Sequence, residues 1–132
     1  MNIEKYKAKT LSQLKATAVR HFHKFIRERD HGKPCVSCGR HTTLQAGHFY
    51  SAGNFPETRF NEDNVHGQCL KCNYFLSGNL IPYRIEIQKR IGGKRFMRLE
   101  NKIIFSRQAR FKWDRFFLID IIETYKAKNK KQ

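Results

Sequence analysis

Apolar residues recur at helical spacing near the start of the chain. They follow one another at intervals of three and four positions with basic residues between them, as is typical of a helix with one buried face. The apolar positions are Leu11, Leu14, Ala18, Phe22, Phe25 and Ile26. Thr10 or Ser12 can cap the start, and "DHGKP" supplies a Gly and a Pro for the end. The pattern predicts a helix over residues 11–30.

The pattern changes between residues 35 and 79. Here the chain has only short β-prone pieces, "TTLQAGHFY" and "NVHGQC", separated by Gly, Asn and Pro. This region is too polar to form a hydrophobic core of its own. We therefore expect a small strand pair that needs some other form of support.

Helical periodicity returns after Asn79. In "LIPYRIEIQKRIGG" one stripe contains Ile81, Ile85, Gln88 and Ile91, and the glycine pair is a stop signal. A last helix with a broad apolar side is expected to start near Ser106 and to run towards Lys126. The sequence thus predicts a single α+β domain over residues 1–132. Its parts are an N-terminal helix at 11–30, a central core at 35–79, C-terminal helices at 80–127 and a solvated basic tail at 128–132.

Composition narrows the choice of partner. Lys and Arg number 27 against 11 Asp and Glu, which leaves a net charge of +16. Such an excess repels itself in a compact fold unless the partner is anionic, so nucleic acid is the first candidate and an anionic membrane surface the second. No stretch has the length of a membrane span or a signal core, so no membrane element is expected. We expect a cytoplasmic protein, in which paired cysteines indicate a metal rather than disulfides.

All four cysteines fall in two CxxC pairs, Cys35 with Cys38 and Cys69 with Cys72. Four thiolates suit the tetrahedral coordination of Zn²⁺, and each pair can present two sulfurs to one ion. A redox pair or unrelated buried thiols are the simpler alternatives, but redox motifs occur singly and no cysteine is left over. A fully coordinated zinc is structural rather than catalytic, so the prediction is a zinc that staples residues 35–79.

The order of His48, Asn64 and the second CxxC pair, after a first CxxC pair, resembles the HNH endonucleases. A closer resemblance is to the phage-lambda NinG (Rap) recombination nuclease family. It rests on "HFHKFIRERD", "CVSCG", "QAGHFYSAGNFPETRFNEDNVHGQCLKCN" and "SGNLIPYR", and it extends from Leu11 to Arg84. The resemblance implies a zinc-stapled, treble-clef-like ββα-metal core flanked by helices.

The resemblance also implies roles for three residues. His48 matches the general base, which accepts a proton from water as a neutral imidazole. Asn64 matches the middle residue of the motif, which orients that base. Asn73 takes the place of the last motif residue, which binds a catalytic Mg²⁺ or Mn²⁺.

One position departs from the pattern. Many HNH proteins carry a metal-binding Asp just before the base, but this chain has Gly47. Because side chains alternate along a strand, Asn64 and His66 share a face, and His66 is our candidate for the missing ligand. Asp63 and Glu62 are weaker alternatives. The ordinary interpretation of such a histidine is a structural or exposed residue.

The densest basic block, "KRIGGKRFMR", is the expected DNA-contacting surface. Its basic residues are Lys89, Arg90, Lys94, Arg95 and Arg98. No segment resembles a base-reading helix, so recognition of shape rather than of sequence is expected.

Together these features predict a divalent-metal-dependent DNA endonuclease. By resemblance, it would cleave or nick branched recombination intermediates, such as D-loops or Holliday-like junctions, for a phage or prophage. Symmetrical cleavage of a junction would suit a homodimer. The alternatives are a non-catalytic zinc module that binds DNA or RNA and a sequence-specific homing-type nuclease, for which the chain has little room.

Overall fold

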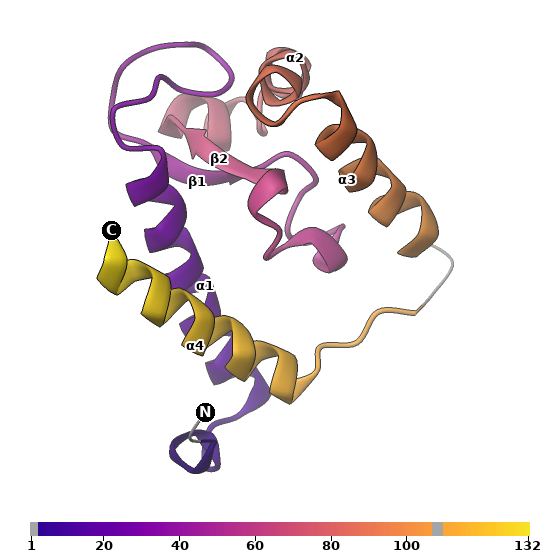
Figure 1. The fold of residues 1–132 in the computed structure, drawn as a ribbon. Coiled ribbons are helices and arrows are strands. Elements are labelled where there is room, and N and C mark those ends of the chain that lie inside the picture. Colours follow the sequence, from indigo (N-terminus) through magenta and orange to yellow (C-terminus); the bar gives the residue numbers. More distant parts are fainter. Residues whose placement is uncertain (1–2, 107–109) are drawn as a thin grey trace.

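A short antiparallel hairpin lies at the centre of the fold (Figure 1). The computed structural model describes residues 3–106 and 110–132. Strands β1 (Gln45–His48) and β2 (Val65–Gln68) pair with Gln45 opposite Gln68 and His48 opposite Val65. A two-stranded sheet this short is marginal by itself, so its neighbours must hold it.

Helix α1 (Leu11–Arg29) leads to the hairpin and ends one residue before the predicted boundary. Thr10, rather than Ser12, is the N-cap: its hydroxyl accepts from the backbone of Gln13, and the Gln13 side chain accepts from the backbone of Thr10. This reciprocal pair is a capping box, which satisfies two backbone donors at the helix start. The predicted N-terminal helix is confirmed.

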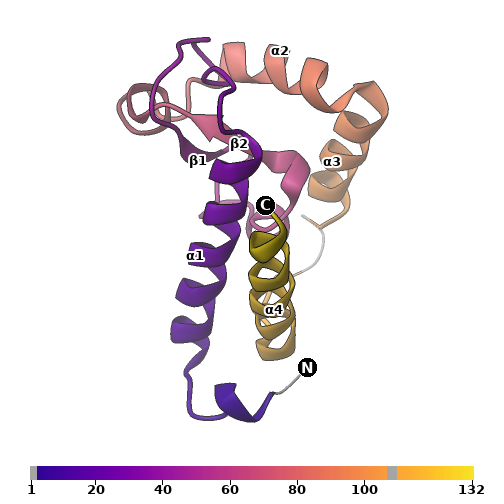
Figure 2. The same ribbon diagram turned by 60° about the vertical axis from the view of Figure 1, so that its left-hand side comes forward.

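Helix α4 (Arg115–Lys131) packs along α1 and runs in the same direction (Figure 2). Arg115 at its start donates to the carbonyls of Tyr6 and Lys9, ahead of α1, and Gln132 at its end reaches Glu28. The expected start near Ser106 was wrong. Asp114 caps α4, because its carboxylate accepts from the backbone of Phe117, and residues 107–109 lie outside the described part of the chain.

The C-terminal residues are also more ordered than expected. Residues 128–131 belong to α4, although the side chains of Lys128, Lys130 and Lys131 are exposed as predicted. Lys128 Nζ lies 2.7 Å from the Glu62 carboxylate, and the Asn129 amide donates to the His21 carbonyl. These contacts fasten the end of α4 to α1 and to the segment before β2.

Helices α2 (Leu80–Ile91) and α3 (Gly93–Ser106) follow the hairpin. The glycine stop is confirmed, since Gly92 has φ +83° and separates the two helices. The predicted stripe of α2 was wrong: apart from Ile91, its members Ile81, Ile85 and Gln88 are exposed. The buried face is instead Tyr83, Ile87 and Ile91.

Two hydrophobic clusters meet at the hairpin. The first joins α1 and α4 to Ala46 and Val65, which are on one face of the sheet. The second joins α2 and α3 to Val36 and Phe49, and the Tyr83 ring contacts His66 on the other face. The hairpin therefore couples two cores that share few side chains.

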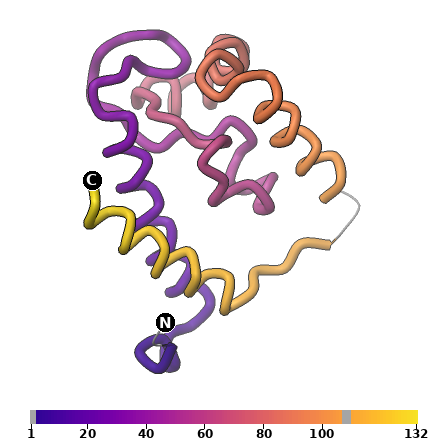
Figure 3. The backbone as a smooth tube through the Cα atoms, in the orientation of Figure 1, coloured from indigo at the N-terminus to yellow at the C-terminus, as the bar shows by residue number. Residues whose placement is uncertain are grey.

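Short helical turns complete the described chain. They are the 3₁₀ turns η1 (Glu4–Tyr6), η2 (Pro56–Thr58) and η3 (Glu62–Asn64) and the π turn η4 (Lys71–Phe75). Figure 3 follows the chain through residues 49–64, the interstrand loop, which leaves β1 and returns to β2 on the side of α3. The result is the expected mixture of helices with a small sheet, except that a π turn, not an α-helix, directly follows β2.

Candidate functional site

The two CxxC pairs converge beside the hairpin. Their four Sγ atoms lie within 4.8 Å of one another, and Cys38 Sγ is 3.8 Å from Cys69 Sγ. Zinc–sulfur bonds of about 2.3 Å in a tetrahedron place sulfurs about 3.8 Å apart. The four cysteines could therefore hold a metal such as zinc, as the sequence predicted. Three of them are buried and only Cys38 is exposed.

The surroundings of Cys35 favour a thiolate. Burial raises the pKa of this thiol, but the backbone N–H groups of Cys38 and Cys69 point at its sulfur and outweigh burial. The net pKa is lowered to about 7, which suits a metal ligand because the thiolate is the ligating form. A bound zinc would be structural here, since four protein ligands leave no position for water or substrate.

His48 lies at the end of β1 with one ring nitrogen fixed. Its Nε2 is 3.0 Å from the carbonyl oxygen of Arg59, in the interstrand loop. A carbonyl can only accept, so Nε2 carries the proton and Nδ1 keeps its lone pair. Burial lowers the pKa of His48, and the Arg59 charge adds to that effect against the pull of its carbonyl. The ring is therefore a neutral base at pH 7.

A second histidine, which the sequence gave no reason to single out, lies against His48. The ring centroids of His23, from α1, and His48 are 5.8 Å apart. Burial, with the nearby His48 and Arg27, lowers the pKa of His23 to about 4. Two neutral imidazoles thus lie together where α1 meets the sheet. Nothing in the sequence of His23 signals this contact, because it arises from tertiary packing.

Asn64 ties the two ends of the interstrand loop together. It is fully buried, and its Oδ1 accepts from the backbone N–H of Tyr50. Its Nδ2 donates to the carbonyls of Tyr50 and Thr58. Since Phe49 also donates to the Asn64 carbonyl, the chain just after His48 is clamped. Asn64 therefore fixes the backbone next to His48.

Asn73 lies in the π turn η4, away from His48. Its amide nitrogen donates to Gln45 Oε1 at the start of β1, whereas His48 ends that strand, about 10 Å further along. The structure therefore does not bring these two predicted site residues together.

His66 is packed into the protein. It is 3% exposed, its Nε2 is 2.9 Å from the Asp63 carbonyl, and Arg29 lies 3.3 Å from its Nδ1. Burial, and then the Arg29 charge, lower its pKa to about 4. His66 pairs with Gly47 in the sheet, so it lies on the face opposite to His48. Its role as a metal ligand stays a prediction, and its contacts are those of a structural residue.

The space beside Gly47 is filled by a residue that the sequence analysis missed. A Cβ built on Gly47 would lie 2.1 Å from Gln68 Oε1 and 2.7 Å from Gln68 Cβ. Gln68 is fully buried, and its Nε2 donates to Ser37 and to the Gly78 carbonyl. Because side chains alternate along β2, Gln68 lies on the same face as His66, so the sequence pattern that pointed to His66 could also have pointed to Gln68.

The two weaker alternatives to His66 are both paired, Asp63 with Arg95 and Glu62 with Lys128.

These positions leave no assembled cage for a second cation. Among the residues that the structure describes, the four cysteines are the one group of three or more His, Cys, Asp or Glu side chains close enough to share an ion. A shared cation site for Asn73 and His66 stays a prediction, and both side chains have hydrogen-bond partners within the protein.

His48 borders a hollow of ≈ 470 Å³, the His48 hollow. Its lining includes His48, Tyr50, Phe55, Leu80, Ile81 and Arg84. The Arg84 guanidinium lies 5.0 Å from the centre of the Phe96 ring and donates to Glu100, which also accepts from the Tyr50 hydroxyl. Arg84 is therefore a positioned cation beside the candidate base. The block "SGNLIPYR" contained it, but its sequence did not place it near His48.

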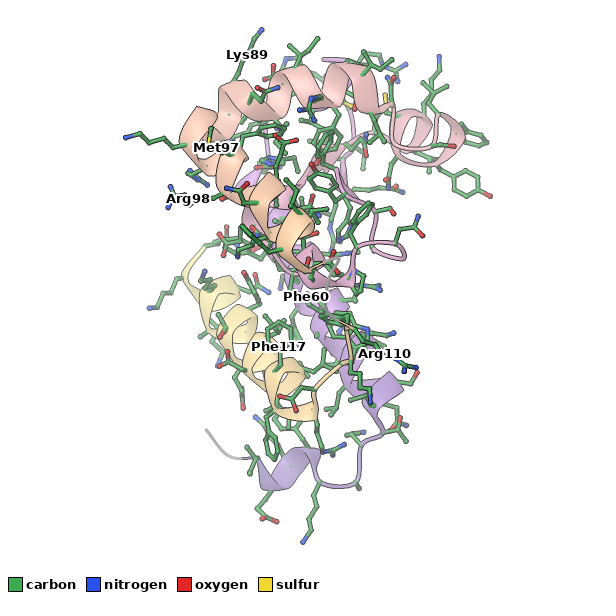
Figure 4. All side chains as sticks on the ribbon, turned by 90° about the vertical axis from the view of Figure 1, so that its right-hand side faces the viewer. Phe60, Lys89, Met97, Arg98, Arg110 and Phe117 are labelled. Atoms are coloured by element: carbon green, nitrogen blue, oxygen red, sulfur yellow. The ribbon has the colours of Figure 1, made fainter. Side chains whose placement is uncertain are left out.

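The five predicted DNA-contacting residues divide into two groups. Lys89, Lys94 and Arg98 are exposed, and Figure 4 shows Lys89 and Arg98 directed away from the body of the protein. The other two have partners within the protein: Arg90 is mostly buried and donates to the Pro34 carbonyl and Glu86, and Arg95, although exposed, pairs with Asp63. The exposed three fit an electrostatic surface better than the paired two.

Aromatic side chains of the interstrand loop and of α4 contact each other. The Phe60 and Phe117 rings are 6.3 Å apart, and both are labelled in Figure 4.

Within the described ranges, 3–106 and 110–132, no helix is both long and apolar enough to cross a membrane.

Comparison with known proteins gives one family. A family model described as "Bacteriophage Lambda NinG protein" matches residues 1–132. "Protein ninG" of Escherichia phage lambda is 54% identical over 70 residues, which are 52% of this chain and 34% of the relative. "Protein ninG" of Salmonella phage P22 is 51% identical over 70 residues, again 52% of this chain and 34% of the relative. The alignments thus span about a third of these relatives, and no solved structure gave a significant match.

Proposed function

This chain belongs to the NinG family, and on that premise we propose that it is an HNH-type DNA endonuclease. It would cleave or nick branched recombination intermediates, D-loops or Holliday-like junctions, in a reaction that needs Mg²⁺ or Mn²⁺. The setting would be the cytoplasm of a bacterial host, with the protein encoded by a phage or prophage. The substrate class comes from the family resemblance, and the chemistry is argued from the residues of this chain.

One observation carries the proposal: His48 Nε2 lies 3.0 Å from the Arg59 carbonyl, which requires its proton there, no hydrogen bond joins Nδ1 to a residue that the structure describes, and the ring borders a hollow that Arg84 also lines. Hydrolysis of a phosphodiester needs a base that takes a proton from water. Nδ1 can do so, because the lowered pKa of His48 keeps the ring neutral at pH 7. Arg84 can hold a phosphate oxygen through charge-assisted hydrogen bonds.

Asn64 serves the base indirectly. By clamping Tyr50 and Thr58 it fixes the loop whose Arg59 carbonyl sets the tautomer of His48. This is the orienting role of the middle motif residue, exerted through the backbone. The cysteine-bound zinc would hold the hairpin under this loop.

The catalytic cation would have few ligands from this chain. Gly47 provides no carboxylate, and Asn73 and His66 lie apart from His48. Mg²⁺ is often bound by few protein ligands together with substrate phosphates. A cation held mainly by substrate phosphates would need few ligands from this chain.

Charge supports DNA as the partner. A net charge of +16 and the exposed Lys89, Lys94 and Arg98 favour binding to phosphates. Such binding weakens with salt, with a log–log slope of about 0.9 per phosphate neutralised. A homodimer would supply two active sites to a symmetrical junction.

The alternative is a non-catalytic zinc-stabilised module that binds DNA or RNA. Its support is the packing of Gln68 against Gly47, which fills the position of the usual metal-binding carboxylate. Such a module would bind branched nucleic acid and cleave none.

The test is a cleavage assay on labelled branched and linear DNA, with Mg²⁺, with Mn²⁺ and without added metal. Metal is removed by dialysis, because a strong chelator would also extract zinc. We expect cleavage of branched DNA with metal and a fall of about a hundredfold or more in His48→Ala, with binding unchanged. The control is His41→Ala, at an exposed histidine, which should retain the full rate.

The pH profile adds a second readout. A general base acts when deprotonated, so a lowered pKa extends the plateau of activity below the usual histidine range, to below about pH 6.5. Cleavage of no substrate by the wild-type protein would favour the binding module. Equal rates for wild type and His48→Ala would remove His48 as the base.

A further inference from the structure

Large apolar side chains are exposed to solvent within and directly after the second CxxC pair. We call them the knuckle surface: Leu70, Tyr74, Phe75, Leu80 and Ile81. Tyr74 is 72% exposed, Phe75 69% and Ile81 83%. Exposed apolar groups gathered in this way usually mark a site of interaction. In Figure 2 the turn that contains Tyr74 and Phe75 projects from the hairpin on the side away from α3 and α4.

The backbone holds these side chains outward. Gly78 N donates to the Cys72 carbonyl at 2.8 Å, and the Asn79 side chain donates to Cys72 Sγ. Ser77 and Asn79 have φ values of +50° and +42°, a left-handed conformation that Asn adopts readily and that is less common for Ser. The turn is thus fixed to the cysteine cluster, and its aromatic tip is not a loose loop.

Charge identifies the kind of ligand that could cover this surface. Between Asp63 and Glu86 the sequence has no acidic residue, whereas Lys71 and Arg84 lie on either side of the turn. Leu80 and Ile81 also line the His48 hollow, together with Arg84. A ligand with flat apolar faces and a chain of negative charges would satisfy both features.

We propose that the knuckle surface stacks on unpaired nucleobases of the DNA, beside the strand that enters the His48 hollow. Aromatic side chains bind bases by stacking in proteins that hold single strands, with basic residues along the backbone. The inference rests on the proposed function only in taking DNA as the partner. It gives a physical reason for a preference for branched DNA, because a branch point exposes bases that a duplex keeps paired.

A second copy of this chain fits the surface less well. A self-complementary contact would bring Lys71 and Arg84 of two molecules together, and like charges across an interface are unfavourable. Five side chains are also few for a stable dimer, which buries about 800 Å² on each partner.

The experiment measures binding without cleavage. A fluorescent single strand and a duplex of the same sequence are titrated, in metal-free buffer, with the zinc-loaded protein and with Phe75→Ala. We expect single-strand affinity to fall about tenfold and duplex affinity to stay within about twofold. Phe75→Trp should restore single-strand binding, because it keeps a stacking face. The matched control is Phe105→Ala, since Phe105 is 71% exposed on α3.

Three results would overturn the inference. They are equal losses on single strand and duplex, no loss on either, and a lower mass in sedimentation for Phe75→Ala than for wild type, which would assign the surface to a second copy. If Phe75→Ala loses affinity only for the single strand and the wild-type protein cleaves no DNA, the result would support this inference and not the proposed nuclease activity. Cleavage of branched DNA with no effect of Phe75→Ala would leave the nuclease standing without it.

Discussion

Gly47 and Gln68 show how one residue can replace the side chain that a motif expects. In the pattern that His48 and Asn64 resemble, the position before the base is often Asp. Here Gln68 reaches across the sheet to that position and is held there by Ser37 and the Gly78 carbonyl. The glycine is therefore required by packing, because any Cβ at 47 would collide with Gln68.

This packing predicts the effect of adding one methyl group. Gly47→Ala should lower the free energy of unfolding by about 1–3 kcal/mol, the usual cost of overpacking, because Gln68 would have to leave its two acceptors. Gly53→Ala is the control: a Cβ there has nothing within 4 Å, and it should change stability by less than about 0.5 kcal/mol. Urea unfolding of both variants gives the comparison. Equal stability of the two would mean that Gln68 moves aside at no cost.

At the scale of elements, α2 has apolar residues on two faces, and only one is buried. Ile87 is fully buried, whereas Ile81 is 83% exposed. Ile87→Ala should therefore cost about 2–5 kcal/mol, whereas Ile81→Ala should cost less than about 0.5 kcal/mol. Thermal or urea unfolding separates the two. A larger loss of stability for Ile81→Ala than for Ile87→Ala would mean that the face predicted from the sequence is the buried one.

The same helix explains what sequence could predict of the fold. The buried face of α1 was predictable because its other faces are polar, so only one face could be the apolar one. In α2 the apolar residues Ile81 and Ile85 lie on one face and Tyr83 and Ile87 on another. Periodicity alone does not show which of two apolar faces is buried in the core. The start of α4 was missed because apolar residues continue on both sides of its cap, Asp114.

The candidate site was predictable where chemistry depends on local spacing. Each CxxC pair places two sulfurs through its own turn, so the cysteine cluster could be expected from sequence. His23 contacts His48 from α1, and Arg84 from α2 lines the same hollow as His48; the folding of those helices against the sheet is not encoded in any short motif.

At the scale of the whole molecule, the cysteine cluster supports a hairpin on which two hydrophobic clusters depend. We expect one zinc per chain, measurable by atomic emission. Its removal should separate the clusters, because zinc binding to such sites is coupled to folding. Near-ultraviolet circular dichroism from Tyr83 and Phe49 should then fade, and the unfolding midpoint should fall. Cys69→Ser should behave like the chelated protein, and an unchanged midpoint in both would show that the hairpin needs no metal.

Acid should weaken the molecule through several buried groups whose lowered pKa values all reduce stability as the pH falls, among them His66 and Asp30. The pKa of His66 is lowered to about 4 from an unfolded value of 6.5, mainly by burial. The unfolded chain therefore binds more protons between these values, and stability falls as pH falls from 6.5 to 4. For Asp30, burial raises the pKa but the bonds from Arg29 and Gly67 outweigh it, so the pKa is lowered to about 2. Its contribution is present above the unfolded value of 3.8 and is lost as pH falls towards 2.

The histidine part of this prediction can be isolated by substitution. Between pH 7 and pH 4.5 the wild type should lose about 2–3 kcal/mol of unfolding free energy through His66. His66→Asn should start less stable but lose correspondingly less over that range, whereas His41→Asn, at an exposed position, should follow the wild type. Urea titrations at each pH, with zinc release monitored in the same samples, separate this slope from loss of the metal. Parallel slopes for wild type and His66→Asn would mean that His66 already binds its proton within the folded protein.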